Sequence, residues 1–246
     1  MILKLLSYNI RFGGVGRESR IAEVIKQVSP DLVVFQEAIA PAVIEKIANE
    51  TGLPFWGARK NHSIGFISRI EPASYEWHYP EAAKHSFLEI VPAGTEARIF
   101  GLHLSARFSK WDERKRARDI RTLLKSLEKY QKGVHLLVGD FNTLAPGELL
   151  EVKRMPAWIR ALVWVSGRDI QRETIQVMID SGYVDGYRLL HKEKGFSFPV
   201  WDPHLRLDYV FVPQHSAARI KTIEVITEFG AETASDHFPL LAQVEL

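Results

Sequence analysis

The stretch from Val134 to Asn142 constrains the fold of this chain more than any other. Four of its first five residues are apolar, Gly139 ends the run, and Asp140 and Asn142 follow. An apolar run this short, with β-branched residues and a glycine stop, is typical of a strand buried on both faces. In open α/β sheets, reactive groups lie just beyond the carboxyl ends of such strands. We therefore expect Asp140 and Asn142 at the rim of a buried sheet.

Two interpretations of Asp140 and Asn142 follow from these residues alone. Both alternate with Phe141, so in a continuing strand their side chains would share one face. A carboxylate and an amide on one face can hold a hard cation, a water or a phosphate oxygen. The alternative is an Asp-Phe-Asn turn that caps a helix.

Short apolar runs and amphipathic segments alternate along the whole chain. Strands are predicted over 2–8, 31–37, 64–68, 74–79, 87–91, 98–103 and 205–212, over 218–226, and in a last strand to Glu245. Helices are predicted over 18–28, from Pro41 to about 52, over 112–130 and over 169–180. Because the two kinds of element are interleaved without a repeat or a linker, we expect one α/β domain over residues 1–246.

The composition excludes several classes of protein. The chain has 246 residues and no cysteine, which rules out disulfides and thiolate metal sites. The first residues show no signal-peptide pattern, and no apolar run is long enough to cross a membrane. We expect a cytoplasmic monomer. The net charge of +2 is weak evidence for a polyanionic partner.

Three segments each have a functional and a structural interpretation. Seven Arg or Lys and three Asp or Glu lie between Arg107 and Arg121, which suits a phosphate-bearing substrate or a solvated helix face. The aromatic loop 196–204 around Trp201 could stack bases or pack internally. Trp158 to Val165 is either a buried helix or an exposed lip that makes peripheral membrane contact.

Polar residues recur where the predicted strands end, and they are spread over the whole chain. They are Asn9, Glu37, His103, Asp140, Asn142, Asp208, Asp236 and His237. This pattern predicts one site where several strand ends meet. A site rich in carboxylate and amide oxygens suits Mg²⁺, Mn²⁺ or Ca²⁺ better than zinc. Two histidines beside carboxylates supply a general base and its orienting partner.

Six short motifs in chain order resemble the endonuclease/exonuclease/phosphatase superfamily. They are Tyr8-Asn9-Ile10-Arg11-Phe12-Gly13, Phe35-Gln36-Glu37, Gly101-Leu102-His103, Gly139-Asp140-Phe141-Asn142, Arg206-Leu207-Asp208-Tyr209 and Ser235-Asp236-His237-Phe238-Pro239. Each motif alone is weak, but all six in order are a strong signal. The resemblance covers essentially the whole chain. It implies a four-layer α/β sandwich, with two central mixed β-sheets packed face to face and helices on both outer sides.

The resemblance also implies roles for individual residues. Glu37 would be the main metal ligand, helped by Asn9 and Asp236. Asp140 and Asn142 would hold the nucleophilic water and a phosphate oxygen, and would touch a second metal. His237 would bond the phosphoryl group or take the proton of the water, with its ring oriented by Asp208. His103 would stabilise phosphate or protonate the leaving group.

The chain departs from the abasic-site endonuclease branch of this superfamily at two positions. That branch has an acid where this chain has Arg11, and a tyrosine where it has His103. These residues resemble the deoxyribonuclease and sphingomyelinase branches more closely.

We expect a phosphodiester hydrolase that depends on Mg²⁺ or Mn²⁺ and acts on DNA or RNA. The alternatives are a sphingomyelinase-like lipid phosphodiesterase and a phosphomonoesterase. A catalytically silent binding module predicts the loss of at least one of four residues, yet Glu37, Asp140, Asp208 and His237 are all present.

Overall fold

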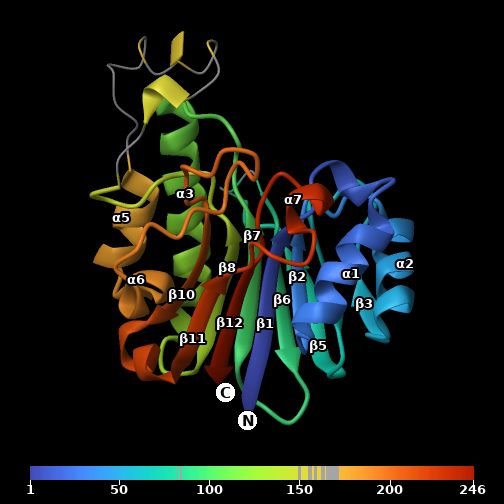
Figure 1. Cartoon of the computed structure of the whole chain (residues 1–246). Coiled ribbons are helices and arrows are strands. Elements are labelled where there is room, and N and C mark those ends of the chain that lie inside the picture. Colours follow the sequence, from blue (N-terminus) through green and yellow to red (C-terminus); the bar gives the residue numbers. More distant parts are fainter. Residues whose placement is uncertain are drawn as a thin grey trace.

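Two mixed β-sheets form the centre of the protein, and helices cover their outer faces (Figure 1). The computed structural model describes residues 1–81, 83, 85–148, 151–154, 157, 160–161, 164 and 172–246, and within them each sheet has six strands. Sheet A has the strand order β11 (Ile220–Val225), β12 (Leu240–Glu245), β1 (Ile2–Asn9), β2 (Leu32–Gln36), β4 (Ile64–Ser68) and β3 (Phe55–Gly57). Sheet B has the order β5 (Pro72–His78), β6 (Phe87–Pro92), β7 (Arg98–His103), β8 (His135–Asp140), β10 (Asp208–Pro213) and β9 (Tyr183–Asp185).

The two sheets pack face to face because both surfaces of their central strands are apolar. On β1, Leu3 and Leu5 lie in the core between the sheets, whereas Leu6 and Tyr8 pack beneath helices. On β8, Leu136 lies between the sheets and its neighbour Leu137 packs on the helix side. Successive side chains of a strand point to opposite faces, so a continuous apolar run fills two cores at once.

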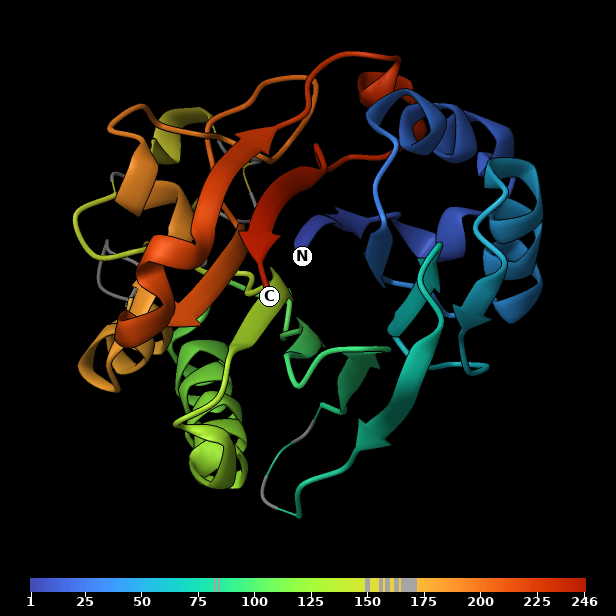
Figure 2. The same ribbon diagram turned by 90° about the horizontal axis from the view of Figure 1, so that it is seen from below.

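Helices on both outer sides complete four layers. Sheet A is covered by α1 (Glu18–Val28), α2 (Pro41–Thr51) and the short α7 (Ala231–Ala234). Sheet B is covered by α3 (Lys110–Leu127) and α5 (Glu173–Asp180), while α6 (Gly186–Leu190) packs beside β10 and β11. Short 3₁₀ turns occur at η1 (Phe12–Gly14), η2 (Glu128–Tyr130), η3 (Val152–Arg154) and η4 (Gln214–Arg219). The two helical layers lie on opposite sides of the sheets in Figure 2, so the four-layer prediction is confirmed.

Most predicted boundaries agree with the structure to within a few residues. Helix α1 ends at Val28 because Ser29 adopts the left-handed conformation, and α2 begins at Pro41 and ends before the left-handed Gly52. Helix α3 begins at Lys110, where the Ser109 side chain accepts a hydrogen bond from the Asp112 amide, and it gives way to η2 after Leu127.

The strand predicted from Leu205 was wrong at its start. Strand β10 begins only at Asp208, and Leu205 instead forms an isolated bridge with Phe198 in the preceding loop. The short elements β3, β9, α6 and α7 were not predicted, because three to five residues are too few to show a hydrophobic period.

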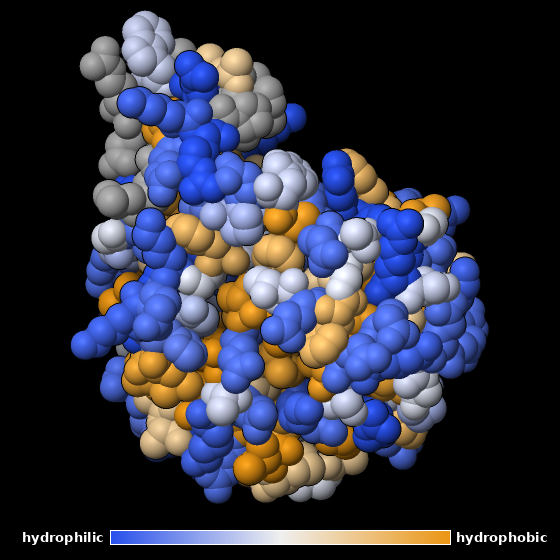
Figure 3. All heavy atoms as spheres, viewed as in Figure 1, coloured by the Kyte–Doolittle hydropathy of each residue, from blue (hydrophilic) through white to orange (hydrophobic). Residues whose placement is uncertain are grey.

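Two predicted segments fall partly on residues that are not described. In the predicted helix 169–180, residues 169–171 lie outside the described residues, and α5 begins at Glu173. In the segment from Trp158 to Val165, predicted as a buried helix or an exposed lip, residues 158, 159, 162, 163 and 165 lie outside them, while Trp164 is 64% exposed. Among the described residues, no helix is long and apolar enough to span a membrane. The face in Figure 3 shows apolar residues in separate groups between polar ones.

Candidate active site

The carboxyl ends of two parallel strand pairs, one from each sheet, meet at one end of the molecule. In sheet A, β1 runs parallel to β2 and pairs Asn9 with Gln36. In sheet B, β7 runs parallel to β8 and pairs His103 with Asp140. The Asn9 side-chain amide donates a hydrogen bond to Oδ2 of Asp140 at 3.0 Å and joins the two strand ends. The predicted site residues of both sheets therefore lie around one rim.

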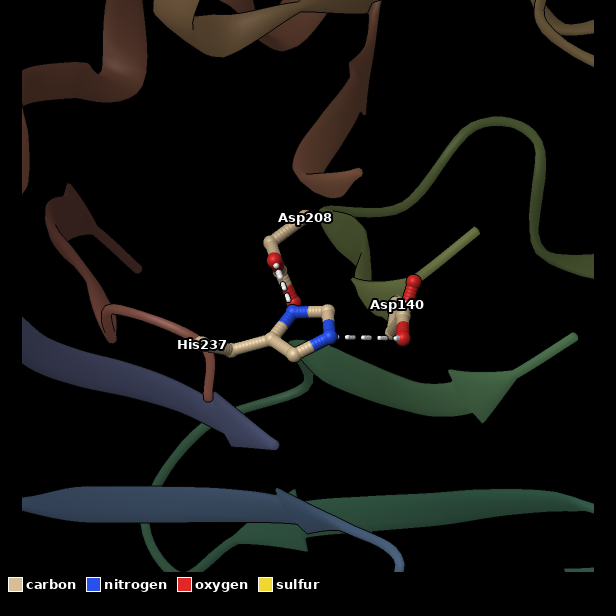
Figure 4. Close-up of side chains that lie close together, drawn as sticks. All are labelled: Asp140, Asp208 and His237. Carbon is tan, nitrogen blue, oxygen red and sulfur yellow. Dashed lines mark hydrogen bonds and ion pairs between the residues drawn. The ribbon is translucent and has the colours of Figure 1, made fainter. Parts of the chain in front are cut away.

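A line of three side chains forms the centre of this rim (Figure 4). Asp208 begins β10 and pairs in register with Asp140, while His237 comes from the loop before β12. Nδ1 of His237 lies 2.8 Å from Oδ2 of Asp208. Nε2 of the same ring lies 3.8 Å from Oδ2 of Asp140. The imidazole thus sits between two carboxylates, with the Phe198 ring 4.6 Å from it, centroid to centroid.

The two carboxylates keep the His237 ring positively charged. Burial alone would lower the pKa of His237, but Asp208 and Asp140 outweigh it and raise this pKa to about 10. Burial also raises the pKa of Asp140, against the opposing effects of the His237 charge and of hydrogen bonds from Asn9 and Asn142. At neutral pH the site therefore combines an imidazolium with a carboxylate of raised proton affinity.

His103 lies on the other side of the same carboxylate but stays neutral. Its Nε2 is 3.8 Å from Oδ2 of Asp140, the distance that also separates His237 from this oxygen. Burial lowers the pKa of His103 to about 4, and the nearby charge of His237 lowers it further.

Asn142 lies in a turn, but this turn does not cap a helix, because residues 143–148 are not helical. Strand β8 ends at Asp140, and Asn142 adopts a left-handed conformation with φ of 52°. Its backbone amide donates to Oδ1 of Asp140 at 2.8 Å, which is an Asx turn. Its side-chain amide donates to the Leu104 carbonyl at 3.0 Å, beyond the end of β7. The side chains of Asp140 and Asn142 do not share one face of a strand, because β8 ends before Phe141.

Arg11 and Phe12 contact three of the side chains predicted as metal ligands. The amide of Arg11 donates to Oδ1 of Asn9 at 3.0 Å, and the amide of Phe12 donates to Oε2 of Glu37 at 2.6 Å. The guanidinium Nε of Arg11 lies 3.3 Å from Oδ2 of Asp236. Glu37 itself is held at φ of 59°, a strained conformation of the kind that clusters at functional sites.

The donor set suits a hard divalent cation. It consists of carboxylate and amide oxygens without sulfur, and within the described residues only one carboxylate oxygen of Glu37 is hydrogen-bonded. Asp140, Asp208 and His237 also offer ligand atoms within 4.8 Å of one another, the one such group in the described part of the chain. There, however, His237 and Asp208 already bond each other. Glu37, which has one carboxylate oxygen without a hydrogen bond, is therefore the more available ligand.

A buried ion pair supports the loops that follow His103 and Asn142. Glu113 and Arg116 on α3 are 1% and 0% exposed and lie 2.8 Å apart. The guanidinium of Arg116 donates to the carbonyls of Ser105 and Arg107, at 2.5 Å and 2.7 Å. The Glu113 carboxylate accepts hydrogen bonds from the Thr143 hydroxyl and the Thr174 amide.

Sequence reasoning missed this pair, because charged residues on a helix are ordinarily exposed. The signal that could have revealed them is their helical spacing with apolar residues of the buried face, Ala117, Ile120 and Leu123. Ser235 was also missed, although its hydroxyl donates to the Asn9 carbonyl at 2.6 Å.

Solved structures of known proteins share this fold. A 3′ phosphatase from Neisseria bound to a product DNA hairpin is 20% identical, with a TM-score of 0.72 over 99% of this chain and 100% of that chain. An AP endonuclease from Archaeoglobus fulgidus is 17% identical, with a TM-score of 0.74 over 99% and 100%. TDP2 of D. rerio in complex with a single-strand DNA product is 16% identical, with a TM-score of 0.67 over 100% and 99%. No curated protein sequence matches this chain.

A family model matches nearly the whole sequence and leaves out only the start of β1 and the end of the chain from residue 238. The model of the Endonuclease/Exonuclease/phosphatase family matches residues 6–237, a range that contains all six motifs except the last two residues of the sixth. Both the two-sheet architecture and the residues gathered at its rim agree with this match. The chain therefore belongs to the Endonuclease/Exonuclease/phosphatase family of phosphoesterases.

Proposed function

We propose that this protein is a divalent-metal-dependent phosphodiester hydrolase that acts on nucleic acid. The observation that carries the proposal is the line of Asp208, His237 and Asp140 at the rim. Hydrolysis at phosphorus requires positive charge beside the phosphoryl oxygens and a base for the attacking water. The line offers both, a buried imidazolium and a carboxylate whose pKa is raised.

Each residue at the rim takes a role that its bonds support. His237 donates a hydrogen bond from Nε2 to a phosphoryl oxygen, while Asp208 fixes its ring through Nδ1. Asp140 holds the water and accepts its proton, since a ring that is already protonated cannot. Asn142 positions Asp140 through its backbone amide, and the neutral His103 bonds the phosphate or the leaving oxygen.

Glu37 would hold the metal with Asn9, and Asp236 would join them once Arg11 releases it. A bound Mg²⁺ or Mn²⁺ supplies charge neutralisation at the phosphoryl and leaving oxygens. Glu37→Gln should therefore shift the metal titration of activity to concentrations at least about tenfold higher, as expected for the loss of a charged ligand. An unchanged titration in a folded variant would remove Glu37 from the metal site.

Nucleic acid is the substrate class that the surroundings of the site favour. Trp201 is 68% exposed, and it contacts Phe198, whose ring packs on His237. An exposed aromatic beside the phosphate-binding group can stack a base of a single strand. Solved structures of the same fold are described with DNA products, which agrees with this choice.

Removal of a terminal phosphate from DNA is the second candidate. One structure of the same fold is a 3′ phosphatase bound to a product DNA hairpin. The same imidazolium and carboxylate would serve a phosphomonoester, because the chemistry at phosphorus is shared.

The first test is Mg²⁺-dependent cleavage of plasmid and single-stranded DNA, with a 3′-phosphorylated oligonucleotide as a parallel substrate. His237→Ala, purified in the same way, controls for contaminating nucleases, and His62→Ala is a control at a half-buried histidine that contacts Tyr79. Cleavage by the wild type and His62→Ala but not by His237→Ala supports the proposal. Release of phosphate alone favours the second candidate, and inactivity on every DNA substrate refutes both as activities on DNA.

A further inference from the structure

Helix α3 carries a row of basic side chains along its outward face. Its buried face packs on sheet B through Ala117, Ile120, Leu123 and Leu127. The opposite face presents five exposed cations that follow one another at intervals of three or four residues, namely Lys110, Arg114, Arg118, Arg121 and Lys125. Residues at this spacing lie on one side of a helix. We call these five residues the α3 stripe.

The α3 stripe extends from the active-site end of the molecule to the opposite end. It begins soon after His103, whose following loop is bonded to Arg116 of the same helix. The 18 residues of α3 span about 27 Å at 1.5 Å per residue. Figure 2 shows α3 nearly end-on at the outer edge of the molecule.

One hollow adjoins the far half of the α3 stripe, and a second lies beyond the end of the helix. The first, of about 380 Å³, is lined by Arg121 and Lys125 together with Glu128 and with Tyr183 of β9. The second, of about 640 Å³, lies beyond the last turn and contains four cations and one carboxylate, from Arg98, Lys129, Lys132, Arg219 and Glu96. The row of positive charge thus continues past the helix into a basic concavity.

The α3 stripe has few partners within the protein. No ion pair joins Arg114, Arg118 or Lys125 to any described residue, and only Arg121 is paired, with Glu173 at 2.7 Å. Like charges at a spacing of four residues destabilise a helix by about 0.2–0.5 kcal/mol per pair. The packing of α3 does not need these cations. Binding of a ligand with negative charges at regular intervals therefore explains their arrangement better than a role in the stability of the helix does.

We infer that the α3 stripe and the basic hollow beyond it bind the phosphate backbone of a polynucleotide that extends from the active site. The inference rests on the proposed function, because the bound strand is the one whose end or interior is cleaved. Trp111, 77% exposed on the same face and 5.6 Å from the Arg114 guanidinium, provides a stacking surface near the site.

An anionic membrane fits this surface less well. A helix that lies on a bilayer buries an apolar face in the lipid, but the apolar face of α3 is packed against sheet B. A narrow row of cations that ends in a concavity matches a linear polyanion, whose binding is governed by the number of phosphates it contacts.

The test compares two triple variants with equal loss of charge. Arg114→Gln, Arg118→Gln and Lys125→Gln together remove three of the four stripe cations that form no ion pair with a described residue. Arg20→Gln, Lys26→Gln and Lys46→Gln remove three exposed cations from α1 and α2, on the other side of the molecule. Glutamine is a good helix former, so both variants should fold. Binding of a fluorescent single-stranded DNA of roughly thirty nucleotides is measured without metal, so that no cleavage occurs.

The stripe variant should bind this DNA at least about tenfold more weakly than the wild type, and the control variant should bind like the wild type. The slope of log affinity against log salt should fall by roughly 2, since each phosphate contact to a single strand contributes about 0.7. Cleavage of a substrate of roughly six nucleotides should be unchanged, because it is too short to follow α3.

Equal losses in both triple variants, or no loss in either, would overturn the inference. So would stripe-dependent binding of phosphatidylserine vesicles with DNA binding intact. The outcome is separable from that of the proposed function, because binding is measured without catalysis. A protein that binds DNA through the α3 stripe but cleaves none refutes only the proposed function.

Discussion

The two histidines at the rim differ in charge although they face the same carboxylate. His237 and His103 each place Nε2 3.8 Å from Oδ2 of Asp140, and both are largely buried. The pKa of His237 is raised to about 10, whereas that of His103 is lowered to about 4. The two pKa values differ because Nδ1 of His237, on the side of the ring away from Asp140, is hydrogen-bonded to Asp208.

This comparison shows that one carboxylate does not charge both rings. Burial disfavours the cation in each histidine, and at His103 the neighbouring His237 and His85 lower the pKa further. At His237 the second carboxylate, Asp208, raises the pKa enough to outweigh the effect of burial. The site therefore has a positively charged ring, His237, on one side of Asp140 and a neutral ring, His103, on the other. Four experiments test this difference.

Removal of the charged ring should have the largest effect. His237→Ala should lower kcat at least about a hundredfold, the lower end for the loss of one preorganised donor to developing charge, because the phosphoryl oxygens lose their imidazolium partner. Single-turnover cleavage measures this loss, and circular dichroism checks the fold. Near-normal turnover in a folded variant would remove His237 from the mechanism.

Loss of the second carboxylate should make His237 resemble His103. Asp208→Asn keeps the shape of the side chain but removes its charge, so the pKa of His237 should fall well below 10, and kcat should fall at least about tenfold. Titration of the ring by NMR follows the pKa directly. A pKa still near 10 in this variant would show that Asp140 suffices.

Removal of the neutral ring should cost less activity. His103→Ala should lower kcat about tenfold, which corresponds to one net hydrogen bond of roughly 1.4 kcal/mol in the transition state. A loss as large as that of His237→Ala would mean that His103 contributes more than a single neutral hydrogen bond.

The neutral ring should also make stability depend on pH. The folded-state pKa of His103 is about 4 and the usual value is 6.5, so the unfolded chain binds the proton more readily. The free energy of unfolding is therefore highest above pH 6.5, where His103 is neutral in both states. It decreases as the pH falls from 6.5 toward 4, because the unfolded chain then binds a proton that the folded protein does not. Between pH 7 and pH 5, the free energy of unfolding of the metal-free wild type should decrease by roughly 2 kcal/mol more than that of His103→Gln, as measured by urea unfolding. Equal losses in both proteins would contradict the assigned charge state.

From the sequence, the polar residues at the strand ends and their assembly into one site could be predicted more fully than the fold. Asp140 and His103 follow apolar runs, and the parallel pairing of β7 with β8 brings them into register. The division into two sheets came from the family resemblance, since hydrophobic periodicity cannot tell which strands pair across long loops. The charge of His237 depends on a contact with Asp208, 29 residues away, and no local pattern encodes such a contact.

The buried ion pair of Glu113 and Arg116 has a consequence for local unfolding. It joins the loops after His103 and Asn142, together with the start of α5, to the first turns of α3 through side-chain to backbone hydrogen bonds. Segments tied in this way open as one cooperative unit. Backbone amides in both loops should therefore exchange with solvent deuterium at the same opening free energy as those of α3. The catalytic rim would then keep its order only as long as that helix stays folded.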